Sequence, residues 1–454
     1  MDVFNHFNVL SLRQMAMTKL AITVGRDPEI MDFVKTNGCA SFIFPSRETH
    51  LYLDAKSQME ERWISKDFLI SYTVSNMYMP PGEPYDFVTR KNILPFARWE
   101  ELVEERIFAL PQPLQQELLD VVRSVNIEID KWIKYHYQFW PKAPEIAYDA
   151  QRYFQWNSFG KIDRGKTARF LISNVRLNIE DHYILTSLYN LMDKKQREER
   201  WPDEIVQKYS SLVENKVVSD HGVMTIRRKE SYYFRRKDSF ITLHFFRKRE
   251  FVKEFLREEC LQYEDFLFYL SHMLDVERKK VFEKRAFKIL QMYFLDWPLQ
   301  CMFLKAAEQL LPYFTEREFL DMLKLIIYER IMLCRKDFNY IDLLKEFWSL
   351  SPSRLQESIE TDSIYESVML IINFPDGEIF PGELLLESSN ADCLTFRYCG
   401  VKYCLVRTEK PFDFVEFFRK NSHRVGPPPV FSNLFSFGKE LKGKYNLMPC
   451  SGAE

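Results

Sequence analysis

The residues most specific for a chemical function are Gly160–Thr167, which read Gly-Lys-Ile-Asp-Arg-Gly-Lys-Thr and match the pattern G-x-x-x-x-G-K-[ST]. In a phosphate-binding loop of this pattern, backbone amides surround the phosphates, the lysine neutralises them and the last hydroxyl holds Mg²⁺. Such a loop needs a buried apolar strand immediately before its first glycine, whereas residues 152–159 are polar and bulky. We therefore keep a P-loop nucleotide-binding site at Gly160–Thr167 as an alternative. The favoured interpretation is a helix that Asp163 caps and that continues through Ala168 and Ile172.

A second candidate site is the segment 227–253, in which basic and aromatic residues are interleaved. Lysine and arginine neutralise phosphates and aromatic rings stack on bases, so the segment suits single-stranded nucleic acid, although an anionic lipid or a nuclear-import receptor would also fit. Charge runs more often form a solvated face beside buried aromatics, so nucleic-acid binding is possible here but not favoured. The basic residues are Arg227, Arg228, Lys229, Arg235, Arg236, Lys237, Arg247, Lys248, Arg249 and Lys253.

Histidine and cysteine spacing predicts no metal site. The eight histidines form no close ligand pair, and the eight cysteines include no Cys-x-x-Cys. Cys393, Cys399 and Cys404 are the one cluster, and a zinc site there would need a distant fourth ligand. We expect free thiols in a reducing compartment. We assign no catalytic, cofactor-binding or metal-binding residue and expect no cofactor.

The first segment with helical spacing begins at Ser11, where Gln14 completes a capping box. Residues 11–20 are similar to the short helix by which ubiquitin-ligase adaptors of the SOCS-box type engage elongin C, with Ala16 where a cysteine is usual. The resemblance implies an apolar ridge that is offered to the groove of a partner protein. No clear cullin-binding segment follows, and ordinary amphipathic spacing produces the same pattern.

The elements that would position these residues are helices. Only 13 of the 454 residues are glycine, whereas 39 are phenylalanine and 23 tyrosine, which argues against a glycine-dependent α/β enzyme. Thr315 with Glu318, and Asn339 with Asp342, predict two helix starts, and another helix is expected to begin at 296–298. Consecutive helices with short links are typical of a helical array. Two candidate repeat spacings disagree, so the pattern suggests a repeat without establishing its period.

The residue pattern changes near residue 362, from helical spacing to segments typical of strands. Val368–Asn373, Glu383–Glu387 and Cys393–Thr408 are β-branched or alternating, and a helix is expected over 411–420. The sequence therefore predicts a mainly α fold. Residues 1–361 are expected to form a solenoid-like helical array with a possible boundary near 150–225, residues 362–421 a small α+β cap, and residues 422–454 a flexible tail.

The overall charge and hydropathy of the chain predict neither nucleic-acid binding nor membrane insertion. The formal net charge is −2, the first residues lack the features of a signal peptide, and no apolar run is long enough to span a bilayer. We expect a soluble intracellular protein, cytoplasmic or possibly nuclear.

Three segments of the chain, Ser11–Ile30, Gly160–Leu171 and Asp296–Pro352, resemble a set of arthropod proteins that have no known activity. Those proteins are helix-rich and repeat-like, so the resemblance implies a helical array and assigns no functional residue. With the composition, it leads us to expect a non-enzymatic scaffold or adaptor that binds an unknown protein partner on the surface of its helices.

Overall fold

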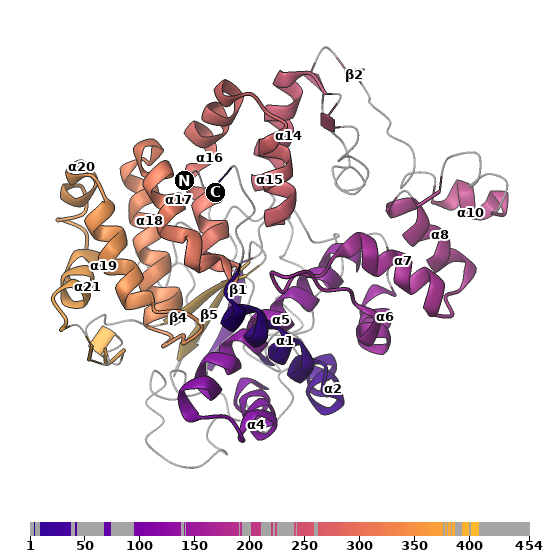
Figure 1. The fold of residues 1–454 in the computed structure, drawn as a ribbon, viewed down its shortest axis with the longest axis horizontal. Helices are drawn as coiled ribbons and strands as arrows, with labels where there is room; N and C mark the ends of the chain where they lie inside the picture. The colour runs from indigo at the N-terminus through magenta and orange to yellow at the C-terminus, as the bar shows by residue number, and fades with distance from the viewer. Residues whose placement is uncertain are drawn as a thin grey trace.

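The computed structural model shows a mainly helical chain, which confirms the predicted fold class at that level (Figure 1). No helix of the described part has an apolar stretch long enough to cross a bilayer. The structure describes residues 4, 10–37, 41–42, 68–73, 95–137, 140, 142–189, 191–192, 201–209, 219–220, 223–224, 240–241, 243–257, 262–375, 377–378, 380–382, 384–385, 393–398 and 401–407.

The first group of helices is built around α5, the longest helix, on which α1, α4 and α6 pack. The predicted capping box of Ser11 and Gln14 is present at the start of α1. The elements of this group are α1 (Leu12–Gly25), α2 (Pro28–Asn37), α4 (Pro95–Ile107), α5 (Gln112–Tyr137), α6 (Ala143–Ala150), η3 (Gln151–Tyr153), α7 (Arg164–Asn174), α8 (Ile179–Leu188) and α10 (Asp203–Lys208).

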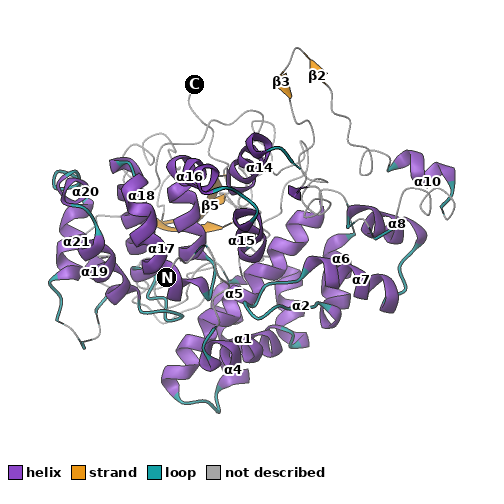
Figure 2. Ribbon diagram, turned by 45° about the horizontal axis from the view of Figure 1, so that its top comes forward, coloured by secondary structure: helices purple, strands orange, loops and turns teal. Residues whose placement is uncertain are grey.

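In the second group, α16–α21 lie beside one another (Figures 1 and 2). The predicted caps at Thr315 and Asn339 are both present, and each side chain accepts a hydrogen bond from the backbone three residues on. The elements are α14 (Phe245–Arg257), α15 (Tyr263–Ser271), α16 (Asp275–Leu295), η4 (Leu299–Met302), α17 (Phe303–Leu310), η5 (Leu311–Tyr313), α18 (Glu316–Ile326), the π-helical turn η6 (Ile327–Ile331), α19 (Tyr340–Leu350), α20 (Ser353–Glu357) and α21 (Ile364–Ile372).

Three local predictions in this half are wrong. Most of Val368–Asn373 belongs to α21 rather than to a strand, because Ile364, Val368 and Ile371 repeat at helical spacing and all are buried. Leu384 and Leu385 are helical as well, within the stretch that was expected to be a strand. The helix expected to begin at 296–298 begins at Phe303 instead, after the 3₁₀ turn η4.

Strands from both ends of the chain form a three-stranded antiparallel sheet with the order β1 (Phe68–Thr73), β5 (Val401–Arg407), β4 (Cys393–Tyr398). A second, two-stranded sheet pairs β2 (Ser219–Asp220) with β3 (Val223–Met224). Because β1 comes from the region predicted to be purely helical, the 362–421 cap is not established as a separate unit. Residues 411–420 and the tail 422–454 lie outside the described residues.

The two helical groups are joined by charged contacts as well as by the apolar core. Asp296, which follows α16, accepts hydrogen bonds at Oδ1 from Lys131 Nζ at 2.9 Å and from Lys161 Nζ at 3.1 Å. Burial opposes ionisation, yet the two ammonium groups hold the pKa of Asp296 well below its usual range. This carboxylate therefore fixes α5 and the chain before α7 against the end of α16.

Candidate protein-interaction surface

The outer face of α1 carries an apolar stripe. Leu12 is 82% exposed and Leu20 is 45% exposed, and Ala16 lies exposed between them. Residues four apart lie on one side of a helix, so these three side chains share a face, which we call the α1 ridge. The opposite face holds Met17 and Ala21, which are buried where α1 packs on α5. The ridge is thus the side of α1 that stays exposed in the described part of the chain.

Polar contacts fix α1 at both of its ends. Arg13 forms an ion pair with Glu117 near the start of α5. Arg26, just after the last turn, donates from Nη2 to the carbonyl oxygen of Phe154 at 2.9 Å. The ridge is therefore carried by an anchored helix, a condition that favours precise recognition.

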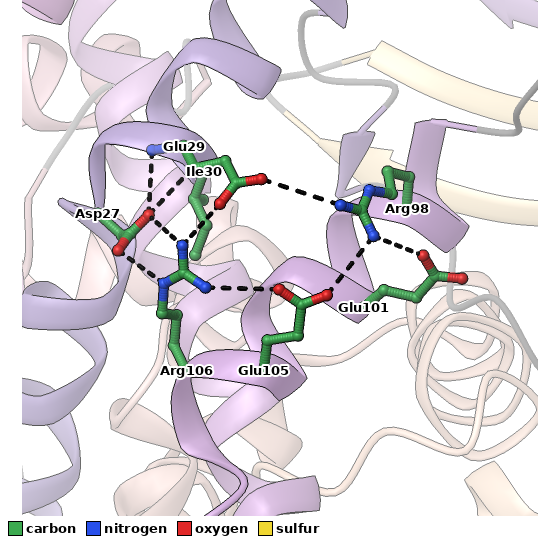
Figure 3. A network of polar contacts seen from close by, with 7 residues as sticks. All are labelled: Asp27, Glu29, Ile30, Arg98, Glu101, Glu105 and Arg106. Atoms are coloured by element: carbon green, nitrogen blue, oxygen red, sulfur yellow. Dashed lines mark hydrogen bonds and ion pairs between the residues drawn. The ribbon is translucent and has the colours of Figure 1, made fainter.

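An exposed ion-pair network holds α2 against α4 (Figure 3). Arg106 donates from Nε to Asp27 Oδ2 at 2.8 Å and from Nη2 to Glu29 Oε2 at 2.7 Å. Asp27 also accepts from the backbone amides of Glu29 and Ile30, so it caps α2 as the sequence predicted. Burial opposes ionisation of Asp27, but these bonds lower its pKa below the ordinary value. Since exposed pairs add little stability, the main effect of the network is to orient α2 and α4.

Gly160–Thr167 form a helix start. Asp163 caps α7, and its Oδ1 accepts from Lys166 N at 2.9 Å, which confirms the predicted cap. Lys166 Nζ, on a side chain that is 69% exposed, lies 3.1 Å from Asp163 Oδ2. The Thr167 hydroxyl is buried and accepts from Gln155 N at 3.0 Å.

This geometry differs from a phosphate cradle in two ways. The carboxylate of Asp163 already accepts a hydrogen bond from the Lys166 amide at the helix start, where a phosphate would bind. Among the described residues just before Gly160, the backbone forms only a single bridge, between Trp156 and Ile162, and no strand. The arrangement therefore favours the helix-cap interpretation of this motif.

The basic-aromatic run is described only from Phe240 onward, and Arg227–Lys237 lie outside the described residues. On α14, Lys248 Nζ donates to the carbonyl of His272 at 3.0 Å. Arg249 Nε and Lys253 Nζ each lie 3.1 Å from Glu250 Oε1. In this half of the run, those cations are engaged by neighbours in the chain rather than presented together to a polyanion.

The surroundings of His136 resemble a catalytic arrangement, because both ring nitrogens are hydrogen-bonded. Its Nδ1 donates to the carbonyl of Trp132 at 2.6 Å, and the Tyr189 hydroxyl donates to Nε2 at 2.5 Å. Burial, with the charge of Arg164 adding to it, lowers the pKa of His136 to about 3 despite the bond to Trp132. With both nitrogens bonded and the side chain fully enclosed, His136 is a neutral core histidine.

Sequence reasoning missed a buried charge cluster, which belongs to the core. Arg123 donates from Nη2 to Glu100 Oε1 at 2.5 Å and from Nε to Asp120 Oδ1 at 3.2 Å. Arg335 reaches the same Asp120 oxygen from 215 positions away. A contact at that separation leaves no local spacing signal, so it could not be found from the sequence.

Thiols and possible metal ligands add no further candidate. Neither Cys301 nor Cys334 forms a disulfide within the described residues. Within the described ranges, no three or more histidine, cysteine, aspartate or glutamate side chains gather closely enough to hold a metal ion.

Comparisons with protein-family models, with curated proteins and with solved structures found no match. The resemblance to arthropod proteins therefore stays an expectation, and the functional assignment depends on the geometry of the α1 ridge.

Proposed function

We propose that this chain is a non-enzymatic adaptor that binds a partner protein through the α1 ridge. The observation that carries the proposal is the exposure of Leu12, Ala16 and Leu20 on an anchored helix whose other face is buried. Burying one leucine side chain contributes about 1.5–3 kcal/mol, so a complementary groove would gain from covering this stripe. Recognition of a helix by a groove commonly uses such spacing.

The partner to test first is elongin C. Residues 11–20 resemble the helix of SOCS-box adaptors, and that resemblance requires the apolar ridge to be accessible. The exposure of the ridge supports it, because a helix with Leu12 and Leu20 buried could not dock in this way. In an adaptor of this kind, the side-by-side helices α16–α21 would form a solenoid-like array that presents a second binding surface.

The test is calorimetric titration of elongin C into the full chain and into two variants. Leu12→Asp places a charge at the most exposed apolar position of the ridge and is expected to weaken binding by at least about tenfold, the equivalent of 1.4 kcal/mol. Leu274→Asp is the matched control, since Leu274 is 69% exposed and lies at the N-cap of α16, where aspartate is favourable. Equal binding by both variants would contradict the assignment of the ridge.

A further inference from the structure

Helices α4 and α5 enclose a groove of about 520 Å³ on their outer side. The lining residues of each wall are spaced i, i+3, i+4 and i+7; α4 contributes three of them and the turn after it contributes Phe108, whereas all four on the other wall belong to α5. The opposite face of α4, which includes Trp99 and Val103, is buried in the core. The groove is lined by Glu101, Glu104, Glu105 and Phe108 on one side and by Gln112, Gln115, Gln116 and Leu119 on the other.

Hydrogen bonds hold the shape of this groove. Gln115 donates from Nε2 to the carbonyl oxygens of Phe108 at 2.9 Å and of Leu110 at 2.5 Å, which fixes the turn between the helices. Glu101 and Glu105 on the α4 wall are oriented by Arg98, whose Nη1 lies 3.0 Å and 3.6 Å from them (Figure 3). The walls are therefore positioned before any ligand arrives.

The charge of the groove is negative. Its lining includes three glutamates and neither lysine nor arginine. Arg98 and Arg106, which pair with Glu101 and Glu105, are shared with carboxylates of the α2 end, as Figure 3 shows. Glu104 has no ion pair in the described part of the chain, and burial, with the charge of Glu101, raises its pKa. A ligand cation beside Glu104 would offset the repulsion between the carboxylates of Glu104 and Glu101.

The groove also has apolar surface at its end and on its α5 wall. Phe108 is 76% exposed, and Leu119 is partly buried against the core. An exposed aromatic ring next to carboxylates favours a cation, because the ring face attracts the charge that the carboxylates also bind.

We propose that the α4–α5 groove binds a basic segment of a partner protein. An arginine or lysine side chain would lie between Glu104 and Phe108, and a neighbouring apolar side chain would pack on Leu119. Charge complementarity selects this occupant, since an acidic or neutral segment would leave the carboxylate of Glu104 without a compensating cation. The lining of the groove includes no residue of the α1 ridge, so the two proposals can be tested with different variants.

The experiment is fluorescence anisotropy of the full chain with a fluorescein-labelled peptide of alternating arginine and leucine. A peptide of the same length with glutamate in place of arginine is the ligand control. Wild type is expected to bind the basic peptide saturably, and to bind it more weakly as salt increases. Glu104→Gln and Phe108→Ala should each weaken binding by about tenfold or more while leaving the circular dichroism spectrum unchanged.

The matched protein control is Glu308→Gln, because Glu308 is an exposed glutamate of α17 outside the groove. It should bind the peptide as wild type does, and so should Leu12→Asp, which separates this proposal from that of the α1 ridge. Three results would each overturn the proposal: no saturable binding of the basic peptide, equal affinity for the glutamate peptide, or unchanged affinity in both groove variants.

Discussion

Arg335 donates from Nη1 to Asp120 Oδ1 at 2.8 Å, across 215 positions of sequence. Both side chains are buried, and Asp120 also accepts from the backbone amide of Lys336 at 2.7 Å. Burial opposes ionisation of Asp120, yet Arg335 and Arg123 lower its pKa. The pair therefore joins α5 to the turn after η6, and so ties the two helical groups together.

Removing one partner of this pair is expected to destabilise the fold strongly. Arg335→Leu leaves Asp120 as a buried carboxylate with less compensation, which costs about 3–5 kcal/mol of unfolding free energy. Urea denaturation measures the loss. The control is Asp149→Asn, which removes the exposed pair that Asp149 forms with Lys35 and should change stability by less than about 0.5 kcal/mol. A loss no larger than that of the control would show that the pair does not join the groups.

The enclosure of His136 predicts a dependence of stability on pH. Its folded pKa of about 3 lies below the ordinary 6.5, so its contribution is complete above pH 6.5 and is lost as the pH falls toward 3. The slope from this group approaches about 1.4 kcal/mol per pH unit. Nuclear magnetic resonance should show an imidazole that does not titrate between about pH 5 and 8. A midpoint near 6.5 would contradict the buried, neutral assignment.

The two glycines of the 160–167 motif are expected to respond in opposite ways. Gly165 lies in the first turn of α7 with space for a side chain, so Gly165→Ala should stabilise the protein by about 0.4–1 kcal/mol. Gly160 has a φ of 65°, and a β-carbon there would lie 2.9 Å from Thr18 Cγ2. Gly160→Ala should therefore cost about 1–3 kcal/mol.

Thermal unfolding of both glycine variants measures these stability effects, and Mg²⁺-ATP is titrated into wild type and into Gly165→Ala. Saturable ATP binding that Gly165→Ala abolishes would favour the phosphate-binding alternative over the helix cap.

Local signals predicted the helix starts well. Asp27, Asp163, Thr315 and Asn339 all cap helices, because a cap depends on hydrogen bonds within three residues. The prediction of a strand at Val368–Asn373 was wrong because it was based on the β-branched composition. The helical spacing of the buried residues determines the structure there, since it lets one face of α21 pack against the core.

Contacts between distant segments could not be predicted in the same way. The pairing of Phe68 with Arg407, and of Asp120 with Arg335, depends on topology and leaves no spacing in the sequence. The α4–α5 groove could be predicted from the sequence only in part. The helical spacing of Glu101, Glu104 and Phe108 is visible in the sequence. Which face of α4 is exposed to solvent depends on how the rest of the chain packs against it.

The most direct test of the adaptor assignment is hydrogen exchange of the full chain, alone and with elongin C. The account predicts that amides of residues 12–20 exchange more slowly in the complex, because the partner covers the α1 ridge and suppresses local opening of the helix. Exchange in α19, which the ridge does not contact, should be unchanged. A complex that forms without slowing exchange in residues 12–20, or the failure of any complex to form, would contradict the proposed adaptor function through elongin C.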